Sequence, residues 1–217
     1  MDMAGWIECY QRRALETFGG RICFMGVQGS RARGEAREES DIDMVLILDE
    51  VDGEDLLAYR AMLQSLEHGE LACGFISGRE VLKSWPRWEL FQFYRDTRPL
   101  YGTLDFLLPL IGPRDIAEAV KNGAANVYHA ACHSLVFGQG PGDVREVAKG
   151  AFFVLQAKCY LEQGQYWGSR AALMEHLAEE EKALLQTEQL EREEALGRLA
   201  AWSGALLTKW KNRNIEK

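Results

Sequence analysis

One stretch constrains the fold of this chain more than any other: an apolar run, a Gly-Ser turn, and a second apolar run that opens with alternating carboxylates. The runs are Arg21 to Val27 and Ile42 to Leu48, and the turn is Gly29-Ser30. Side chains alternate across a strand, so Asp41 and Asp43 point to the same side. Two close carboxylates repel each other unless a cation lies between them, and Mg²⁺ favours such oxygen ligands. The amides of the turn lie where a short helix would begin, which suits a phosphate. The stretch predicts two strands beside a phosphate and metal site.

The composition permits one or two small domains and limits the partners. With 217 residues, 47% of them hydrophobic, the chain can bury a core. Its net charge of -8 argues against a protein that binds nucleic acid by broad phosphate neutralisation. The five cysteines are odd in number and lack metal-ligand spacing, which indicates reduced thiols in a cytoplasmic protein. We expect no signal peptide and no membrane-spanning segment.

The N-terminal part alternates helix-like and strand-like patterns. Apolar positions at helical spacing, closed by Gly19-Gly20, predict a helix from Trp6 to Phe18. Asp52 is predicted to cap a helix from about Gly53 to Leu66. Glu70 to Ser77 predicts a third strand, although Gly74 weakens it. These elements predict a small mixed sheet with helices over residues 1–102.

Helical periodicity fills the rest of the chain. The predicted helices run from Ile116 to Phe137, Val144 to Gln163, Arg170 to Leu185 and Leu190 to Trp210. Their short connections predict an all-α antiparallel helical bundle over residues 103–217. Thr97 to Gly102 is predicted to be the hinge between the two parts. The predicted fold class is therefore α+β, a mixed-sheet domain followed by a helical bundle, with an active site between them.

The turn and the carboxylates carry a family resemblance. Gly29-Ser30, ten residues, then Asp41-x-Asp43 resembles the signature of the DNA polymerase β-like nucleotidyltransferase superfamily. The added Arg31-Ala32-Arg33-Gly34 is most similar to its minimal nucleotidyltransferases, including antitoxin-type members. The resemblance implies that Gly29-Ser30 holds the β- and γ-phosphates of a nucleoside triphosphate. It implies that Asp41 and Asp43 are catalytic and bind Mg²⁺ while a hydroxyl attacks the α-phosphorus.

The two arginines after the turn have two interpretations. Arg31 and Arg33 are candidates for a contact with the phosphate or the acceptor, and equally for exposed charges on the short helix. Of the two, Arg33 is assigned to nucleotide binding.

The superfamily also places a third carboxylate on the next-but-one strand. In this chain that position falls on Cys73 or Gly74. Glu70 would face the same side of the strand as the expected carboxylate, but it lies about four residues before that position, roughly 13 Å along an extended strand. Glu80 follows the strand and would have to fold back. Because the third carboxylate completes the metal site or acts as general base, either another residue replaces it or activity is reduced or lost.

The C-terminal part carries a second resemblance. Lys149 to Gly164, leading into Ser169-Arg170, is similar to the helical domain of aminoglycoside nucleotidyltransferases, where a helix ends in a Glu-x-Gly turn. There, basic residues on the helix and after the turn contact the triphosphate, which makes Lys149, Lys158 and Arg170 the candidates here. Lys149 and Lys158 are nine apart, so they cannot both face one point. Lys158 and above all Arg170 are assigned to nucleotide binding.

Three weaker patterns have plainer interpretations. His129 and His133 are four apart and could share a metal, but ordinary helix packing is favoured. Arg170 and His176 match the loose pattern of HEPN ribonucleases, a spacing that arises easily by chance. Most tryptophans are expected in the core, with Trp85 and Trp88 as candidates for an acceptor pocket.

The functional hypothesis is Mg²⁺-dependent transfer of a nucleoside monophosphate, from ATP or another nucleoside triphosphate, to a hydroxyl of a small molecule such as an aminoglycoside. The helical domain favours this over the antitoxin type, which normally stands alone. Two alternatives stay open: protein nucleotidylation, and a degenerate protein that binds a nucleotide or a partner without turnover. The sequence leaves the acceptor and the oligomeric state open.

Overall fold

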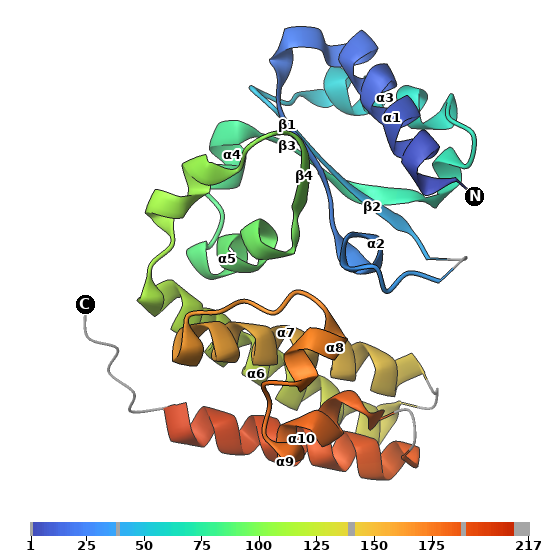
Figure 1. The fold of residues 1–217 in the computed structure, drawn as a ribbon. Coiled ribbons are helices and arrows are strands. Elements are labelled where there is room, and N and C mark those ends of the chain that lie inside the picture. Colours follow the sequence, from blue (N-terminus) through green and yellow to red (C-terminus); the bar gives the residue numbers. More distant parts are fainter. Residues whose placement is uncertain (1, 38–39, 139–141, 188–189, 211–217) are drawn as a thin grey trace. The chain divides into compact units, whose positions relative to one another are not determined.

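The computed structural model describes residues 2–37, 40–138, 142–187 and 190–210 of the chain. The chain divides into two compact units (Figure 1). Unit 1 comprises residues 1–86 and 93–110, and unit 2 comprises residues 87–92 and 111–217. The predicted division into 1–102 and 103–217 differs from this by residues 103–110 and by the segment 87–92. None of the helices within the described residues is both long and apolar enough to cross a membrane.

Unit 1 is built on a four-stranded mixed sheet in the order β3-β2-β1-β4. The strands are β1 (Ile22–Val27), β2 (Ile42–Leu48), β3 (Ala72–Gly78) and β4 (Arg98–Gly102). β1 pairs antiparallel with β2 and with β4, while β3 pairs parallel with β2. The predicted bounds of β2 are confirmed, and the strands predicted for β1 and β3 are confirmed to within two residues.

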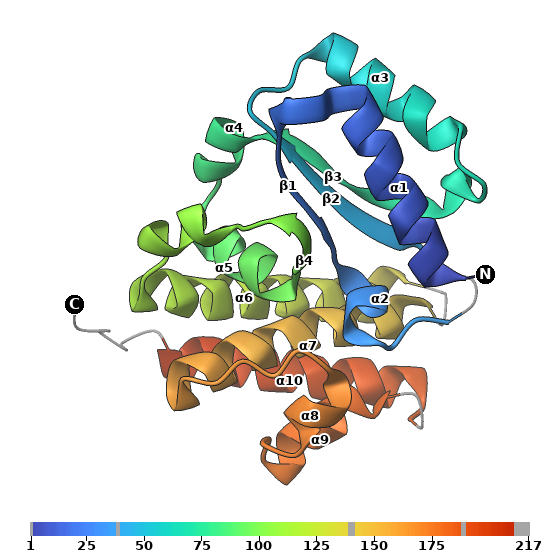
Figure 2. The same cartoon turned by 45° about the horizontal axis from the view of Figure 1, so that its top comes forward.

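Two helices cover one face of the sheet (Figure 2). They are α1 (Met3–Phe18) and α3 (Gly53–Gln64), and they bury Tyr10 and Met62 in one cluster with the strands. On β2 this face carries the residues with even numbers, which are Ile42, Met44, Leu46 and Leu48. The remaining helices of unit 1 are α2 (Gly29–Arg33) and α4 (Arg79–Lys83), and residues 93–96 of α5 (Arg87–Asp96) also belong to it. Its 3-10 turns lie at Gly19–Arg21, Gly69–Leu71 and Asp105–Leu110.

The start of α3 is fixed by the cap that the sequence predicts. Asp52 accepts hydrogen bonds from the amides of Glu54 and Asp55 at 2.8 and 2.9 Å, and Asp55 accepts one back from the Asp52 amide at 3.1 Å. Asp55 also accepts from both terminal nitrogens of Arg21, at 2.6 and 2.9 Å. The Arg21 hydrogen bond first, and the Asp52 amide second, lower the pKa of Asp55 below its ordinary value of 3.8.

This lowered pKa predicts a loss of stability in acid. Asp55 releases its proton more readily in the folded state, so its contribution is present above its unfolded pKa and is lost as the pH falls through the folded one. Asp55→Asn is therefore expected to be less stable than wild type at about pH 7, by a margin that narrows as the pH approaches about 3. Urea unfolding across this pH range measures the difference in unfolding free energy between wild type and Asp55→Asn. A difference in unfolding free energy between Asp55→Asn and wild type that stays constant with pH would contradict the expectation.

Unit 2 is helical. Its helices are α6 (Pro113–Phe137), α7 (Gly142–Gln163), α8 (Arg170–Met174), α9 (Glu179–Leu185) and α10 (Arg192–Trp210). The three long helices share a buried apolar cluster, to which α6 contributes alanines at positions 117, 124 and 131. Because these alanines recur every seven residues, they form a narrow stripe of small side chains that lets a neighbouring helix approach closely. The predicted α+β fold, a mixed sheet followed by a helical region, is confirmed.

Two local predictions are wrong. Thr97 to Gly102 is not a free hinge, because residues 98–102 form β4 beside β1. Pro99 lacks an amide hydrogen, and a strand at the edge of a sheet tolerates it.

The single helix predicted from Arg170 to Leu185 is two helices, because the helical conformation is interrupted between Met174 and Glu179. Packing decides this break: Leu173, Leu177 and Leu185 are buried in one cluster, and the His176 ring stacks on Trp167 at 3.8 Å.

Candidate active site

The Gly-Ser turn opens the five-residue helix α2, directly after β1. The amide of Gln28 donates to the carbonyl of Asp43 at 2.8 Å, which ties the turn to the start of β2. Gly29 has a φ of 70°, a backbone conformation that favours glycine. A Cβ atom on Gly29 would lie 2.0 Å from Oδ2 of Asp43. The absence of a side chain at Gly29 is therefore what allows the turn and the carboxylate to touch.

The two predicted carboxylates lie on the sheet face opposite α1 and α3. Asp41 and Asp43 alternate with Ile42 and Met44, which are buried in the cluster under those helices. Asp41 is exposed just before β2, and Asp43 is half-buried on it. Carboxylate oxygens are the donors that Mg²⁺ prefers, so this pair fits the metal that the resemblance implies. Across the described residues, no group of three or more His, Cys, Asp or Glu side chains gathers to hold a metal.

Arg31 has a structural partner within the same motif. Its Nε donates to the carbonyls of Ser40 and Asp41, at 3.2 and 3.0 Å, and its terminal nitrogen also donates to Ser40. The side chain thus fixes the backbone that leads into the two carboxylates. These hydrogen bonds explain why an arginine occurs at position 31, and a contact with phosphate is not needed to explain it.

Arg33 pairs with Asp96, a residue that no motif singled out. Its Nη1 lies 2.8 and 2.9 Å from the two carboxylate oxygens of Asp96, and its Nε lies 3.0 Å from Glu35. The side chains of Arg33 and Asp96 are each only 11% exposed. Burial, and after it the nearby Asp43, raise the pKa of Asp96 above its ordinary value. The backbone of Gly29 and the guanidinium of Arg33 both favour the charged form of Asp96 and so oppose this rise in pKa.

Strand β3 confirms that the expected third carboxylate position is not acidic. Cys73 pairs with Asp43 in the sheet, and Gly74 pairs with Met44. Cys73 is an exposed free thiol. A side chain at Gly74 is excluded, because its Cβ would lie 2.0 Å from the Met44 carbonyl oxygen.

The two glutamates considered as substitutes lie outside the strand. Glu70 lies in the 3-10 turn before β3, 3.6 Å from His68. Glu80 lies in α4 and pairs with Lys83 at 3.0 Å. Asp96 is instead the carboxylate that pairs with α2, through Arg33.

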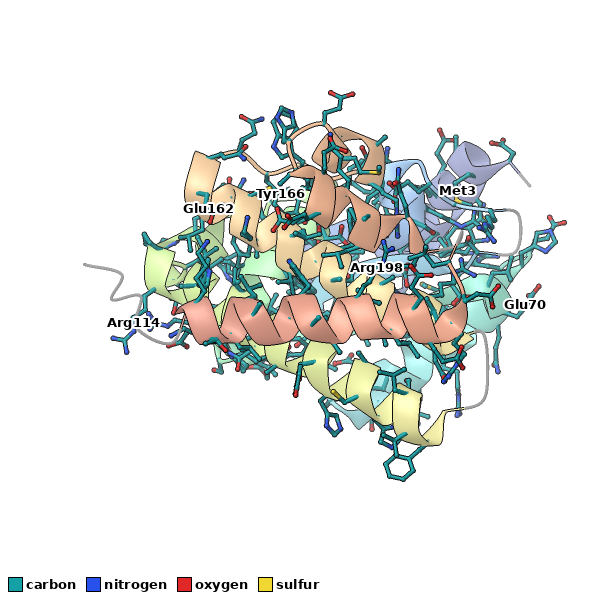
Figure 3. All side chains as sticks on the ribbon, turned by 90° about the horizontal axis from the view of Figure 1, so that it is seen from below. Met3, Glu70, Arg114, Glu162, Tyr166 and Arg198 are labelled. Carbon is teal, nitrogen blue, oxygen red and sulfur yellow. The ribbon has the colours of Figure 1, made fainter. Side chains whose placement is uncertain are left out.

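The basic candidates of unit 2 also have protein partners. Lys158 pairs with Glu162 at 3.0 Å and with Glu181 at 3.2 Å, and Glu162 is labelled at the end of α7 in Figure 3. Arg170 donates to the carbonyl of Leu185 and lies 5.8 Å above the ring of Phe152. Lys149 is exposed. The assignment of Lys158, Arg170 and Arg33 to nucleotide binding stays a prediction. To bind a nucleotide, each side chain would have to give up a contact that it now makes within the protein.

The weaker patterns show ordinary packing. His129 and His133 are both exposed on α6 with ring centroids 6.0 Å apart, and the ring of His133 also lies 5.1 Å from that of Phe137. The ring of Trp85 packs against Phe75 at 4.9 Å. These contacts account for the side chains without a ligand.

The mixed sheet, the glycine turn and the paired carboxylates of β2 define the class of nucleotidyltransferases. Residues 9–77 match the family model described as a nucleotidyltransferase domain. This part of the chain is thus a nucleotidyltransferase domain, and the match supports the predicted resemblance to the DNA polymerase β-like superfamily.

Two solved structures are similar to the chain. One is a spectinomycin adenyltransferase from Enterococcus faecialis, solved with ATP and spectinomycin; it is 11% identical, with a TM-score of 0.56 over 97% of this chain and 100% of its own. This likeness concerns the fold. The other is a nucleotidyltransferase-like protein from Exiguobacterium sibiricum, 10% identical, with a TM-score of 0.34 over 93% of this chain and 74% of its own. A comparison with curated proteins found no match.

Proposed function

We propose that this protein is a Mg²⁺-dependent nucleotidyltransferase that moves the nucleoside monophosphate of ATP to a hydroxyl of a small molecule. The observation that carries the proposal is the close approach of Gly29 to Asp43, which joins the glycine of the turn to one of the two carboxylates at the start of β2 within a nucleotidyltransferase domain. ATP and spectinomycin are the molecules bound by the similar adenyltransferase, and they supply the first donor and acceptor to test.

Each residue of the motif has a distinct task in this reaction. Asp41 and Asp43 would hold Mg²⁺, which would stabilise the negative charge that develops on the phosphates. In this proposal the phosphates lie against the Gly29-Ser30 turn, where a glycine permits close approach to the backbone and backbone amides can donate to phosphate oxygens. The acceptor supplies the attacking hydroxyl, so the reaction needs no nucleophilic side chain.

One observation favours a second candidate, a protein that binds Mg²⁺-ATP without turnover. Cys73 and Gly74 occupy the positions where the superfamily carries its third carboxylate, and the packing of Gly74 against Met44 excludes any side chain there. A site that lacks a general base retains its phosphate and metal contacts while its chemical step slows.

A transfer assay separates the two candidates. Purified protein is incubated with Mg²⁺, ATP and spectinomycin, with release of pyrophosphate and the mass of the acceptor as readouts; reactions without acceptor or with excess EDTA are the controls. We expect acceptor-dependent pyrophosphate release and an adenylylated product. A rise in melting temperature with Mg²⁺-ATP, but no release with any of a panel of aminoglycosides, would favour binding without turnover. Absence of both effects would contradict the proposed function.

A further inference from the structure

Gln28 lies where β1 passes into the Gly-Ser turn, and it is bonded to two other parts of unit 1. Its backbone amide donates to the carbonyl of Asp43, on β2, at 2.8 Å. Its side-chain nitrogen donates to the hydroxyl of Thr97 at 2.6 Å and to the carbonyl of Phe93 at 3.3 Å. The main chain of Gln28 is thus tied to the strand of the carboxylates, and its side chain is tied to the end of α5.

The side chain of Gln28 does not cap the helix that follows it. Gln28 immediately precedes α2 and has extended backbone angles, with a φ of -118° and a ψ of -173°. A residue at this position commonly accepts hydrogen bonds from the first helical amides, but the side chain of Gln28 accepts none of them. An isolated helix of five residues is not stable in water, so the orientation of α2 depends on contacts from outside the helix. The hydrogen bonds of Gln28 are contacts of this kind.

The hydrogen bonds around Thr97 require the amide nitrogen of Gln28. The Thr97 hydroxyl has one proton and donates it to the carbonyl of Phe93, so it accepts from Gln28. The Phe93 carbonyl has no proton and also accepts. Both hydrogens of the Gln28 amide group are therefore used, and a side chain without such a donor cannot form these bonds.

Thr97 is itself held in one orientation. Its side chain is buried. A Cβ atom on Gly26 would lie 2.7 Å from Cγ2 of Thr97, so the Thr97 methyl group packs directly on the glycine two residues before Gln28. Because a β-branched side chain has few rotamers, turning the hydroxyl away from Gln28 would also move the methyl group out of its place.

We propose that Gln28 is a positioning residue of the candidate site: through Thr97 and Phe93 it fixes the orientation of the Gly-Ser turn toward Asp43. Gln28 is bonded to the Asp43 carbonyl, and the next residue, Gly29, lies against the Asp43 side chain. A rotation at Gln28 would therefore move Gly29 relative to the carboxylate. The effect of Gln28 on nucleotide binding rests on the proposed function, whereas its effect on the turn does not.

The test removes each side of one hydrogen bond in turn. Gln28→Met keeps the length of the side chain without its donor, and Thr97→Val keeps the shape without the hydroxyl. Thr97→Ser, which keeps the hydroxyl, is the conservative variant. Gln11→Met is the matched control, since Gln11 also donates its side-chain amide to a backbone carbonyl of unit 1, that of Leu100 at 3.2 Å. That bond joins α1 to β4 and does not involve the turn.

Two readouts are needed. The first is the protection of the Gln28 and Ala32 amides from hydrogen exchange without nucleotide; the Gln28 amide donates to Asp43, and the Ala32 amide donates to the Gln28 carbonyl at 3.4 Å. The second is the dissociation constant for Mg²⁺ with a non-hydrolysable ATP analogue, obtained by titration.

We expect Gln28→Met and Thr97→Val each to lower the protection of both amides about fivefold and to weaken binding of the analogue by a similar factor. The double variant should lie within about twofold of the more affected single variant, because the two substitutions remove the same bond. Thr97→Ser and Gln11→Met should stay within about twofold of wild type in both readouts.

Unchanged protection of the Gln28 amide in Gln28→Met and Thr97→Val would overturn the inference, as would lower protection without weaker binding of the analogue. An equal loss in Gln11→Met would also overturn it, since the effect would then be one of general stability. If Gln28→Met does not fold, Thr97→Val compared with Thr97→Ser decides by the same criteria. If wild type does not bind the analogue, the proposed function is wrong, and protection of the two amides alone decides whether Gln28 positions the turn.

Discussion

Asp43→Asn is expected to reduce nucleotidyl transfer by about three orders of magnitude, or about 4 kcal/mol of transition-state stabilisation. The substitution keeps the size of the side chain and its packing against Gly29 but removes the charge that, in the proposed reaction, holds Mg²⁺. The rise in melting temperature produced by Mg²⁺-ATP should disappear with it. Asp41→Asn should change both quantities in the same direction, because the two carboxylates share one face at the start of β2.

Asp49→Asn is the matched control for this prediction. Asp49 follows the other end of the same strand, where it pairs with Arg21 at 3.1 Å, far from the turn in sequence and in register. This variant should retain nucleotidyl transfer and the rise in melting temperature that Mg²⁺-ATP produces. Should the double variant Asp41→Asn, Asp43→Asn retain both activity and binding, the assignment of the site to this carboxylate pair would be wrong.

The second large effect is expected at Gly29, and the chain supplies its own reference at Gly34. Both residues have positive φ, 70° and 73°, so alanine costs about 1 kcal/mol of folding stability at either position from backbone conformation alone. A Cβ at Gly34 meets nothing within 4 Å, whereas a Cβ at Gly29 would lie 2.0 Å from Oδ2 of Asp43. Gly29→Ala must therefore also displace the carboxylate or the turn.

Comparing the two variants isolates the effect of that displacement. Urea unfolding should show Gly29→Ala to be about 1 kcal/mol less stable than Gly34→Ala, since the clash adds to the backbone cost. Gly34→Ala should bind Mg²⁺-ATP like wild type, and Gly29→Ala should lose measurable binding in the same titration. Equal affinities for the two variants would show that the contact between Gly29 and Asp43 has no part in binding nucleotide.

Much of unit 1 followed from local patterns. The strand Ile42–Leu48 was predicted at its observed bounds because an apolar run bounded by polar residues is decided by its own side chains. The cap of α3 by Asp52 was predicted and is confirmed, since a capping carboxylate needs only the amides two and three residues ahead. The place of Asp41 and Asp43 on one face follows from alternation alone.

The errors share a physical cause, which is pairing between residues far apart in sequence. Residues 98–102 carry no strong strand pattern and become a strand because β1 offers them an edge. The helical pattern from 170 to 185 is genuine, but burying Leu173, Leu177 and Leu185 in one cluster breaks it. Within the candidate site, Asp96 was missed because nothing in its local sequence marks it; a polar residue ending a helix just before a strand was its only signal.

The sequence by itself indicated a nucleotidyltransferase domain. It determined the position of the turn and the alternation of the two carboxylates, because both depend on backbone and side-chain preferences within a short stretch. It also determined that β3 lacks an acidic side chain beside Asp43. The tertiary structure alone decided which carboxylate pairs with Arg33. Asp96 meets Arg33 because the ends of α5 and α2 lie together, a contact between residues far apart in sequence that no local pattern marks.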